Sequence, residues 1–157
     1  MTFLPLLAGE RSPGWAAHAT GTIHGLRLST TPLEVLQAAL EVVALRLALL
    51  CEQFGEHAQP IVASGGALEA SNAWAQIIAN ALNRPLKRID GEITARGTAV
   101  LVLTALGRHA LDGRSLSDFP LQAIETITPQ SAAVEALRAA RQRQQDLYRR
   151  FYEITGA

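Results

Sequence analysis

The sequence is poor in the residues and runs that mark secreted or membrane proteins. Cys51 is the one cysteine in 157 residues, which excludes an internal disulfide and favours a reducing compartment. No apolar run reaches the roughly 18 to 20 residues needed to span a membrane. The first residues also lack the basic and small-residue parts of a signal peptide. These absences predict a soluble cytoplasmic protein.

An excess of one charge is also missing. Lys and Arg together number 14, as do Asp and Glu, so no basic face for nucleic acid is expected. The four histidines are scattered and give no metal-ligand spacing with the single cysteine. The P-loop and Rossmann glycine patterns do not occur either. What is present, 48% apolar and 18% charged residues, predicts one folded domain with a real core.

Alternating strand and helix patterns predict an α/β fold with some parallel sheet. Short apolar or alternating runs predict strands, and longer runs with apolar residues at three- and four-residue steps predict helices. Residues 111–130 hold Pro120 and Pro129 and are interpreted as a loop. The expected strands cover 3–7, 21–28, 60–63 and 86–89; the expected helices cover 31–55, 71–82, 95–110 and 131–154.

The helix over 31–55 has the clearest boundaries. Thr31 is the expected N-cap, with Pro32 in the first turn, Glu34 completing a capping box and Gly55 as the stop. Two apolar stripes predict that the helix is covered on much of its circumference. The first stripe is Leu33, Leu36, Leu40, Val43, Leu47, Leu50 and Phe54, and the second is Val35, Val42, Leu45 and Leu49.

A glycine pair ends the apolar strand over 60–63. Ser64-Gly65-Gly66-Ala67 lies between that strand and the helical pattern that follows, for which Ser71 is the expected N-cap. Glycine lets a flat ring or a phosphate approach the main chain, and N–H groups at a helix start favour an anion. A nucleotide suits such a place. An ordinary strand-to-helix turn has the same residues, so the pair by itself leaves both interpretations open.

The order of motifs resembles the FGGY family of carbohydrate kinases. Gly21–Leu26 and Glu34–Glu41 resemble its second signature, and Phe3–Trp15 is similar to its segment with Gly-Glu-Arg before Pro and Trp. Further matches are Ser64–Ala67 with Ser71–Gln76 and Glu92–Ala99. Among family members, Ala8–Trp15 and Ser64–Trp74 are most similar to gluconate kinase and then to xylulose kinase.

The resemblance implies a partial actin-like ATPase (ribonuclease H-like) lobe, in β-α-β-α-β-α order with an additional C-terminal helix. Family enzymes are much longer and have two lobes, so the chain is interpreted as the C-terminal portion of the second lobe, without the first lobe or the opening strands of the second. The general-base aspartate of the family belongs to the first lobe. We therefore expect no catalytic residue and no metal ligand here, and no sugar kinase activity from the chain alone.

The implied function is the ATP-binding part of a kinase that phosphorylates a sugar or sugar acid, gluconate-like, with ATP and Mg²⁺. Gly65, Gly66 and Ala67 would present backbone to the nucleotide, with Ser71, Asn72 or Gln76 at the rim. Trp74 borders adenine or belongs to the core. Glu10 and Arg11 either face the cleft between lobes or form a loop ion pair or helix cap.

Two departures accompany the match. The stretch from Gly66 to Trp74 is one residue longer than in many members, and Asn80 stands where aspartate is usual. The alternative function is a non-catalytic nucleotide-binding or protein-interaction module, which forms a homodimer or pairs with the missing lobe, because an incomplete lobe exposes apolar surface. A generic α/β domain is the third interpretation.

Overall fold

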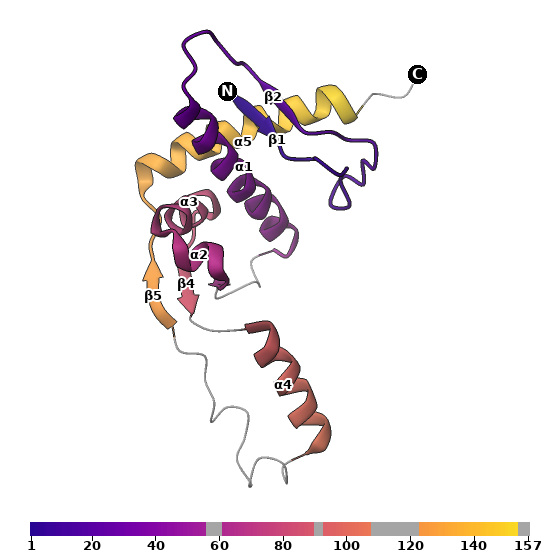
Figure 1. The fold of residues 1–157 in the computed structure, drawn as a ribbon, viewed down its shortest axis with the longest axis vertical. Coiled ribbons are helices and arrows are strands. Elements are labelled where there is room, and N and C mark those ends of the chain that lie inside the picture. Colours follow the sequence, from indigo (N-terminus) through magenta and orange to yellow (C-terminus); the bar gives the residue numbers. More distant parts are fainter. Residues whose placement is uncertain (56–60, 90–92, 108–122, 154–157) are drawn as a thin grey trace.

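The computed structural model describes residues 1–55, 61–89, 93–107 and 123–153 (Figure 1). Strands and helices alternate along most of the chain, as the sequence pattern predicts. In order they are β1 (Thr2–Leu4), β2 (Thr22–His24), α1 (Pro32–Gln53), β3 (Ile61–Ala63), α2 (Gly66–Ala70), α3 (Asn72–Leu82), β4 (Leu86–Ile89), α4 (Ile93–Leu106), β5 (Ala123–Ile127) and α5 (Ser131–Tyr152).

The strands form two small sheets. β1 pairs antiparallel with β2, and a three-stranded sheet has the order β3-β4-β5. β3 and β4 are parallel, so the prediction of some parallel sheet is confirmed. β1 and β2 are shorter than the predicted strands over 3–7 and 21–28, because Pro5 follows β1 and Gly25, at φ +82°, follows β2.

β5 corrects the interpretation of residues 111–130 as a loop. Residues 111–122 lie outside the described part of the chain, but Ala123–Ile127 pairs antiparallel with β4, placing Ile127 opposite Leu86. The segment lies between two prolines and alternates only partly, which hid it in the sequence. Its partner decides its conformation, since β-structure depends strongly on tertiary context.

The ends of α1 are those that the sequence predicts. Thr31 N–H donates to Glu34 Oε2 at 2.7 Å, and Glu34 N–H donates to the Thr31 hydroxyl at 3.3 Å, which completes the capping box. The helix ends at Gln53 with Phe54 as its C-cap, and Gly55 takes the left-handed conformation at φ +68°. The described part of α5 also agrees with the helix expected over 131–154.

The main core lies where α1 packs on α3, which in turn contacts β4 and β5 of the three-stranded sheet. Ala44, Ala75 and Ala79 have no exposed surface, and small side chains at a helix contact let the two axes approach closely. Ile78 of α3 and Leu86 of β4 fill the space between the helices and the sheet. This contact holds α3, and with it the segment after β3, on the rest of the fold.

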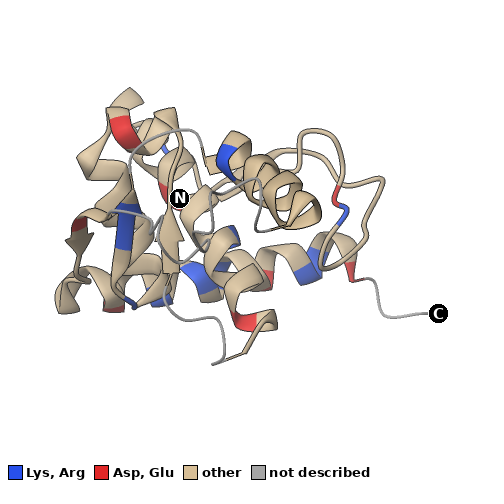
Figure 2. Ribbon diagram, turned by 90° about the horizontal axis from the view of Figure 1, so that it is seen from below, with Lys and Arg blue, Asp and Glu red and all other residues tan. Residues whose placement is uncertain are grey.

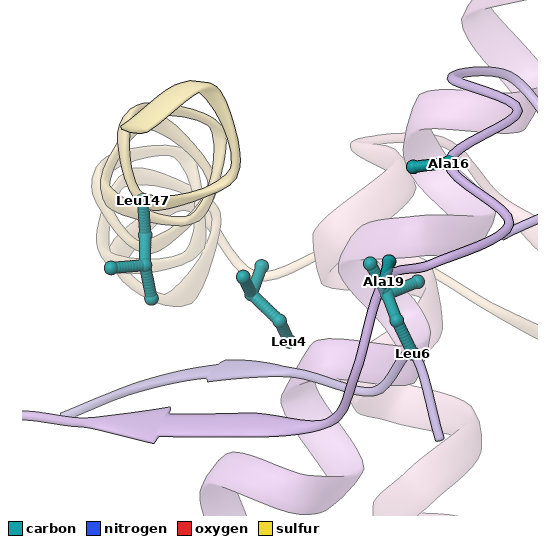
Figure 3. Close-up of a cluster of buried hydrophobic side chains, with 5 residues drawn as sticks. All are labelled: Leu4, Leu6, Ala16, Ala19 and Leu147. Atoms are coloured by element: carbon teal, nitrogen blue, oxygen red, sulfur yellow. The ribbon is translucent and has the colours of Figure 1, made fainter. Parts of the chain in front are cut away.

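A second cluster joins the N-terminal segment to the last helix. Leu4 of β1 and Leu147 of α5 belong to one buried cluster, which Leu6, Ala16 and Ala19 complete (Figure 3). The buried Gln144 of α5 donates to the carbonyl of Phe3 at 3.1 Å. Segments 141 positions apart in sequence therefore share one core.

A buried carboxylate lies beside this cluster. Glu10 pairs with Arg46 of α1 and accepts a hydrogen bond from the Tyr148 hydroxyl of α5. Burial and the neighbouring Glu10 raise the pKa of Tyr148 to about 12. Tyr152, one turn later, accepts from Thr20 N–H at 3.1 Å, which lowers the pKa of its phenol.

Two apolar surfaces differ from the expectations. The first stripe of α1 faces solvent, with Leu33, Leu36 and Leu47 exposed by 72%, 56% and 38%. The second stripe supplies Val42 and Leu45 to the core. The helix is therefore not covered on much of its circumference, because the described elements that pack on it occupy only one face.

The helix predicted over 95–110 begins at Ile93 and is α4. Its many small residues predict a helix packed tightly against a sheet, and this prediction is wrong for the described chain. No residue of α4 is buried, a side chain at Gly97 would meet nothing within 4 Å, and Figure 1 shows the helix apart from the others. Its apolar composition therefore has no partner among the described elements.

The two tyrosines provide a test of the buried carboxylate. Because the pKa of Tyr148 is raised, its neutral form stabilises the fold below about pH 10, and this contribution is lost as pH rises from about 10 to about 12. Absorbance at 295 nm should resolve two steps, the upper one absent in Tyr148→Phe and the lower one in Tyr152→Phe. A single step for both phenols near pH 10 would contradict the described contact.

Candidate functional site

The glycine pair lies at the carboxyl end of β3, where the chain leaves the sheet. Gly65 has φ +117° and ψ 149°, a conformation that only glycine adopts without strain. It precedes the five-residue helix α2, and Leu68 and Glu69 N–H both donate to the Gly65 carbonyl. The sequence predicts one helix after the glycine turn. The structure has two, the short helix α2 and then α3.

The two glycines leave open space beside the main chain. A methyl group built at Gly65 or at Gly66 would meet no atom within 4 Å. Both glycines and Ala67 are exposed. The backbone here can be approached by a flat or charged ligand with no side chain in the way.

Ser71 and Asn72 lie at the start of α3, on the other side of α2. The Ser71 hydroxyl accepts from Trp74 N–H at 3.2 Å, so its role as N-cap is confirmed. Asn72 is exposed, and its Oδ1 accepts from Arg88 at 2.7 Å. The structure therefore brings together the five predicted nucleotide residues in one segment, 65–72, though only as neighbours around a short helix.

Arg88 is the residue of this site that sequence reasoning missed. It lies on β4, and its Nη1 also donates to the Leu68 carbonyl at 3.1 Å. Its Nη2 lies 2.6 Å from Glu125 Oε1 of β5, an ion pair without hydrogen-bond alignment. The sequence held one signal for this role. Arg88 is a charged residue in a short strand whose ends, Leu86 and Ile89, are buried.

Glu10 and Arg11 do not belong to this segment. Glu10 is 5% exposed and engaged by Arg46 and Tyr148, while Arg11 is exposed. A cavity of about 260 Å³ lies between residues 10–14, α1 and α5, and Glu10 is part of its lining. The ion pair of Glu10 is therefore with Arg46 of α1 and not within the loop, and a role of Glu10 and Arg11 in a cleft between lobes stays a prediction.

The polar residues of α3 hold the fold together. Trp74 packs against the core around Ala44, and its indole donates to the Leu40 carbonyl at 3.3 Å. Gln76 donates to Asn80 Oδ1 at 3.0 Å and to the Thr128 carbonyl at 2.9 Å. Asn80 Oδ1 also accepts from Gln130 N–H at 2.8 Å. Asparagine in place of the usual aspartate thus ties α3 to the start of α5.

Among the residues that the structure describes, charged side chains of both signs are spread over the fold and do not gather around one point (Figure 2). Within the described ranges, no group of three or more His, Cys, Asp and Glu is placed to hold a metal ion. His57, His109, Asp90, Glu92 and Asp112 lie outside those ranges. No helix of the described part is long and apolar enough to cross a membrane.

Comparison with known proteins identifies relatives of the chain. A model of the FGGY family of carbohydrate kinases, C-terminal domain, matches residues 1–106. Glycerol kinase from Nitrosomonas eutropha is 35% identical in an alignment 105 positions long that covers 63% of this chain. Among solved structures, a xyloylose kinase from Brucella ovis has a TM-score of 0.81 at 32% identity over 98% of the chain. Gluconate kinase from Lactobacillus acidophilus has a TM-score of 0.77 at 25% identity over 97% of it.

The chain is short beside these proteins. It spans 21% of the glycerol kinase, 33% of the Brucella enzyme and 32% of the gluconate kinase. Its structural neighbours are FGGY kinases, so the predicted α/β, actin-like ATPase fold class is confirmed. The matched residues 1–106 include the glycine turn, Asn72 and Arg88.

Substitutions at Gly65 and Gly66 distinguish the effect of backbone strain from the effect of filling the open space. Gly65→Ala places a side chain at φ +117° and should lower the free energy of unfolding by about 1–3 kcal/mol. Gly66→Ala lies at the first position of α2, meets no atom, and should leave stability unchanged or raise it by up to about 1 kcal/mol. Urea unfolding of both variants measures the difference. Equal destabilisation would show that the described turn is wrong.

Proposed function

Because the chain belongs to the FGGY family of carbohydrate kinases through its C-terminal domain, we propose that it supplies the ATP side of a sugar kinase. The parent enzyme transfers the γ-phosphate of ATP to a hydroxyl of a sugar or sugar acid. The observation that carries the proposal is the open backbone at Gly65 and Gly66, within the part of the chain that matches the family.

The nucleotide lies, in this proposal, along residues 65–72. Gly65, Gly66 and Ala67 present main chain to it, and Asn72 offers a polar group at the rim. Two features support this placement: the segment follows a parallel strand at its carboxyl end, a usual ligand position in α/β sheets, and Arg88 fixes it from the next strand. The Ser71 hydroxyl already accepts the capping hydrogen bond of α3, so we propose a smaller contribution to nucleotide binding from Ser71.

Catalysis needs groups that lie outside this chain. Phosphoryl transfer depends on positioning and on neutralising charge around the γ-phosphate. Mg²⁺ in such sites is held by one or two carboxylates together with the substrate phosphates, and we propose that these carboxylates lie outside this chain. We place the general-base aspartate and most sugar contacts in the first lobe, and propose a gluconate-like acceptor on the resemblance at Ala8–Trp15. If the pure chain, given ATP, released ADP only when a sugar was added, the proposed inactivity of the isolated chain would be contradicted.

Nucleotide binding by the chain itself is directly testable. In ¹H–¹⁵N spectra of the chain titrated with ADP and then ATP, shift changes should centre on the amides of residues 65–72. Gly66→Ala should weaken the affinity about tenfold, because a methyl group occupies the open space, while the fold stays intact.

Leu7→Ala, a truncation at an exposed position outside the segment, is the control and should bind ADP as the original chain does. Shifts centred elsewhere, or a Gly66→Ala variant of unchanged affinity, would contradict the proposed site.

A second candidate, a protein-interaction module, is favoured by the exposed stripe on α1. Leu33, Leu36, Val43 and Leu47 recur at the spacing by which helices pack together, and they face solvent here. Contiguous exposed apolar surface of this kind drives association. We propose that it is covered by the remainder of the kinase polypeptide, and that the chain alone covers it by pairing with a second copy.

This candidate predicts that the pure chain sediments as a dimer. The double substitution Leu36→Glu with Leu47→Glu places charge on the stripe and should give a monomer. Leu7→Glu makes the same change at an exposed leucine away from α1 and should leave the dimer intact. An original chain that sediments as a well-behaved monomer would exclude self-association through this surface.

A further inference from the structure

Arg88 contacts three separate segments around the glycine turn. From β4 its guanidinium reaches the Leu68 carbonyl of α2 at 3.1 Å and Asn72 Oδ1 at 2.7 Å. It also reaches Glu125 of β5 at 2.6 Å. The Arg88 side chain is 12% exposed, and its bond to the Leu68 carbonyl is partly buried, while its bond to Asn72 lies at the surface. A planar guanidinium with five donors is the side chain that can serve several acceptors at once.

The contact with Asn72 fixes which way the amide of that residue points. Arginine has donors and no acceptor, so the atom facing it is the amide oxygen. The Nδ2 hydrogens of Asn72 therefore point away from Arg88, on an exposed residue at the start of α3. With its oxygen engaged, Asn72 is set to donate.

This orientation has a chemical consequence for the ligand. An asparagine that reads adenine with both amide atoms accepts from the 6-amino group and donates to N7. Asn72, its oxygen held by Arg88, is suited to the donor half of that pair. Ring nitrogens, ribose oxygens and phosphate oxygens are acceptors that such a group can recognise, and guanine offers ring acceptors as adenine does.

We infer that Arg88 is the positioning residue of the nucleotide turn, holding α2 and presenting the Asn72 amide as a donor to a bound nucleotide. The inference rests on the proposed function, because residues 65–72 are there the nucleotide segment. It adds that contacts from β4 and β5 hold residues 65–72 in place. It also adds that Asn72 recognises an acceptor common to adenine and guanine nucleotides.

The first measurement needs no nucleotide. In Arg88→Gln, hydrogen exchange at the Leu68 and Glu69 amides should rise about tenfold or more, because hydrogen bonds from a charged donor are lost. Arg88→Lys should restore part of the protection. Arg138→Gln, an exposed arginine paired within α5, is the matched control and should leave these amides unchanged. If Arg88→Gln does not fold, Glu125→Gln tests the same clamp from its exposed partner.

The second measurement separates positioning from simple stability. Asn72→Asp keeps an oxygen for Arg88 and should keep the protection at Leu68, but it loses the donor and adds negative charge. Calorimetric titration should then show ADP and GDP affinities both lowered about tenfold or more.

Each outcome decides one part of the inference. Unchanged exchange in Arg88→Gln and Arg88→Lys would overturn the clamp. Unchanged ADP affinity in Asn72→Asp would overturn the donor role, as would a loss confined to ADP, since the acceptor is shared. An original chain that binds neither nucleotide would refute the proposed function, and the exchange data alone would then show whether Arg88 holds the turn.

Discussion

The guanidinium of Arg88 is the interaction on which the candidate site depends. It joins β4 to the backbone of α2, to Asn72 and to Glu125 on β5, which lie before and after β4 in the sequence. Loops with few long-range contacts are the first parts of a protein to open, and a glycine pair increases that tendency. The partly buried charge of Arg88 counters this tendency, because its removal leaves the Leu68 carbonyl and Asn72 Oδ1 without their donor. The same contact gives Asn72 its direction, so local order and ligand chemistry come from one side chain.

The sequence was sufficient for features that local chemistry decides. The capping box at Thr31, the stop at Gly55 and the cap at Ser71 each depend on residues within one helical turn, and the structure confirms them. β5 and the role of Arg88 depend instead on strand neighbours, which sequence spacing does not reveal. The exposed stripe of α1 was misjudged for a related reason. Apolar periodicity shows that a face is to be covered, but the covering element need not be in the same stretch of chain.

The resemblance to carbohydrate kinases and the incomplete packing are consistent with one another. The chain spans about a fifth to a third of its relatives and neighbours, and it has two apolar surfaces, on α1 and α4, without partners among the described elements. Its own two cores are nevertheless closed, one around Ala44 and one around Leu147. The proposal that the chain is the nucleotide side of a sugar kinase accounts for these exposed apolar faces, because further polypeptide would cover them.

The placement of the nucleotide is the central claim, and a direct measurement of contact tests it. Intermolecular nuclear Overhauser effects between ADP and the isotope-labelled chain report which amides lie beside the adenine and ribose protons. We expect contacts to Gly66, Ala67 and the Asn72 side-chain amide. Contacts instead to the cavity beside Arg46 and Tyr148, or to no residue of 65–72 under conditions where ADP is bound, would contradict it.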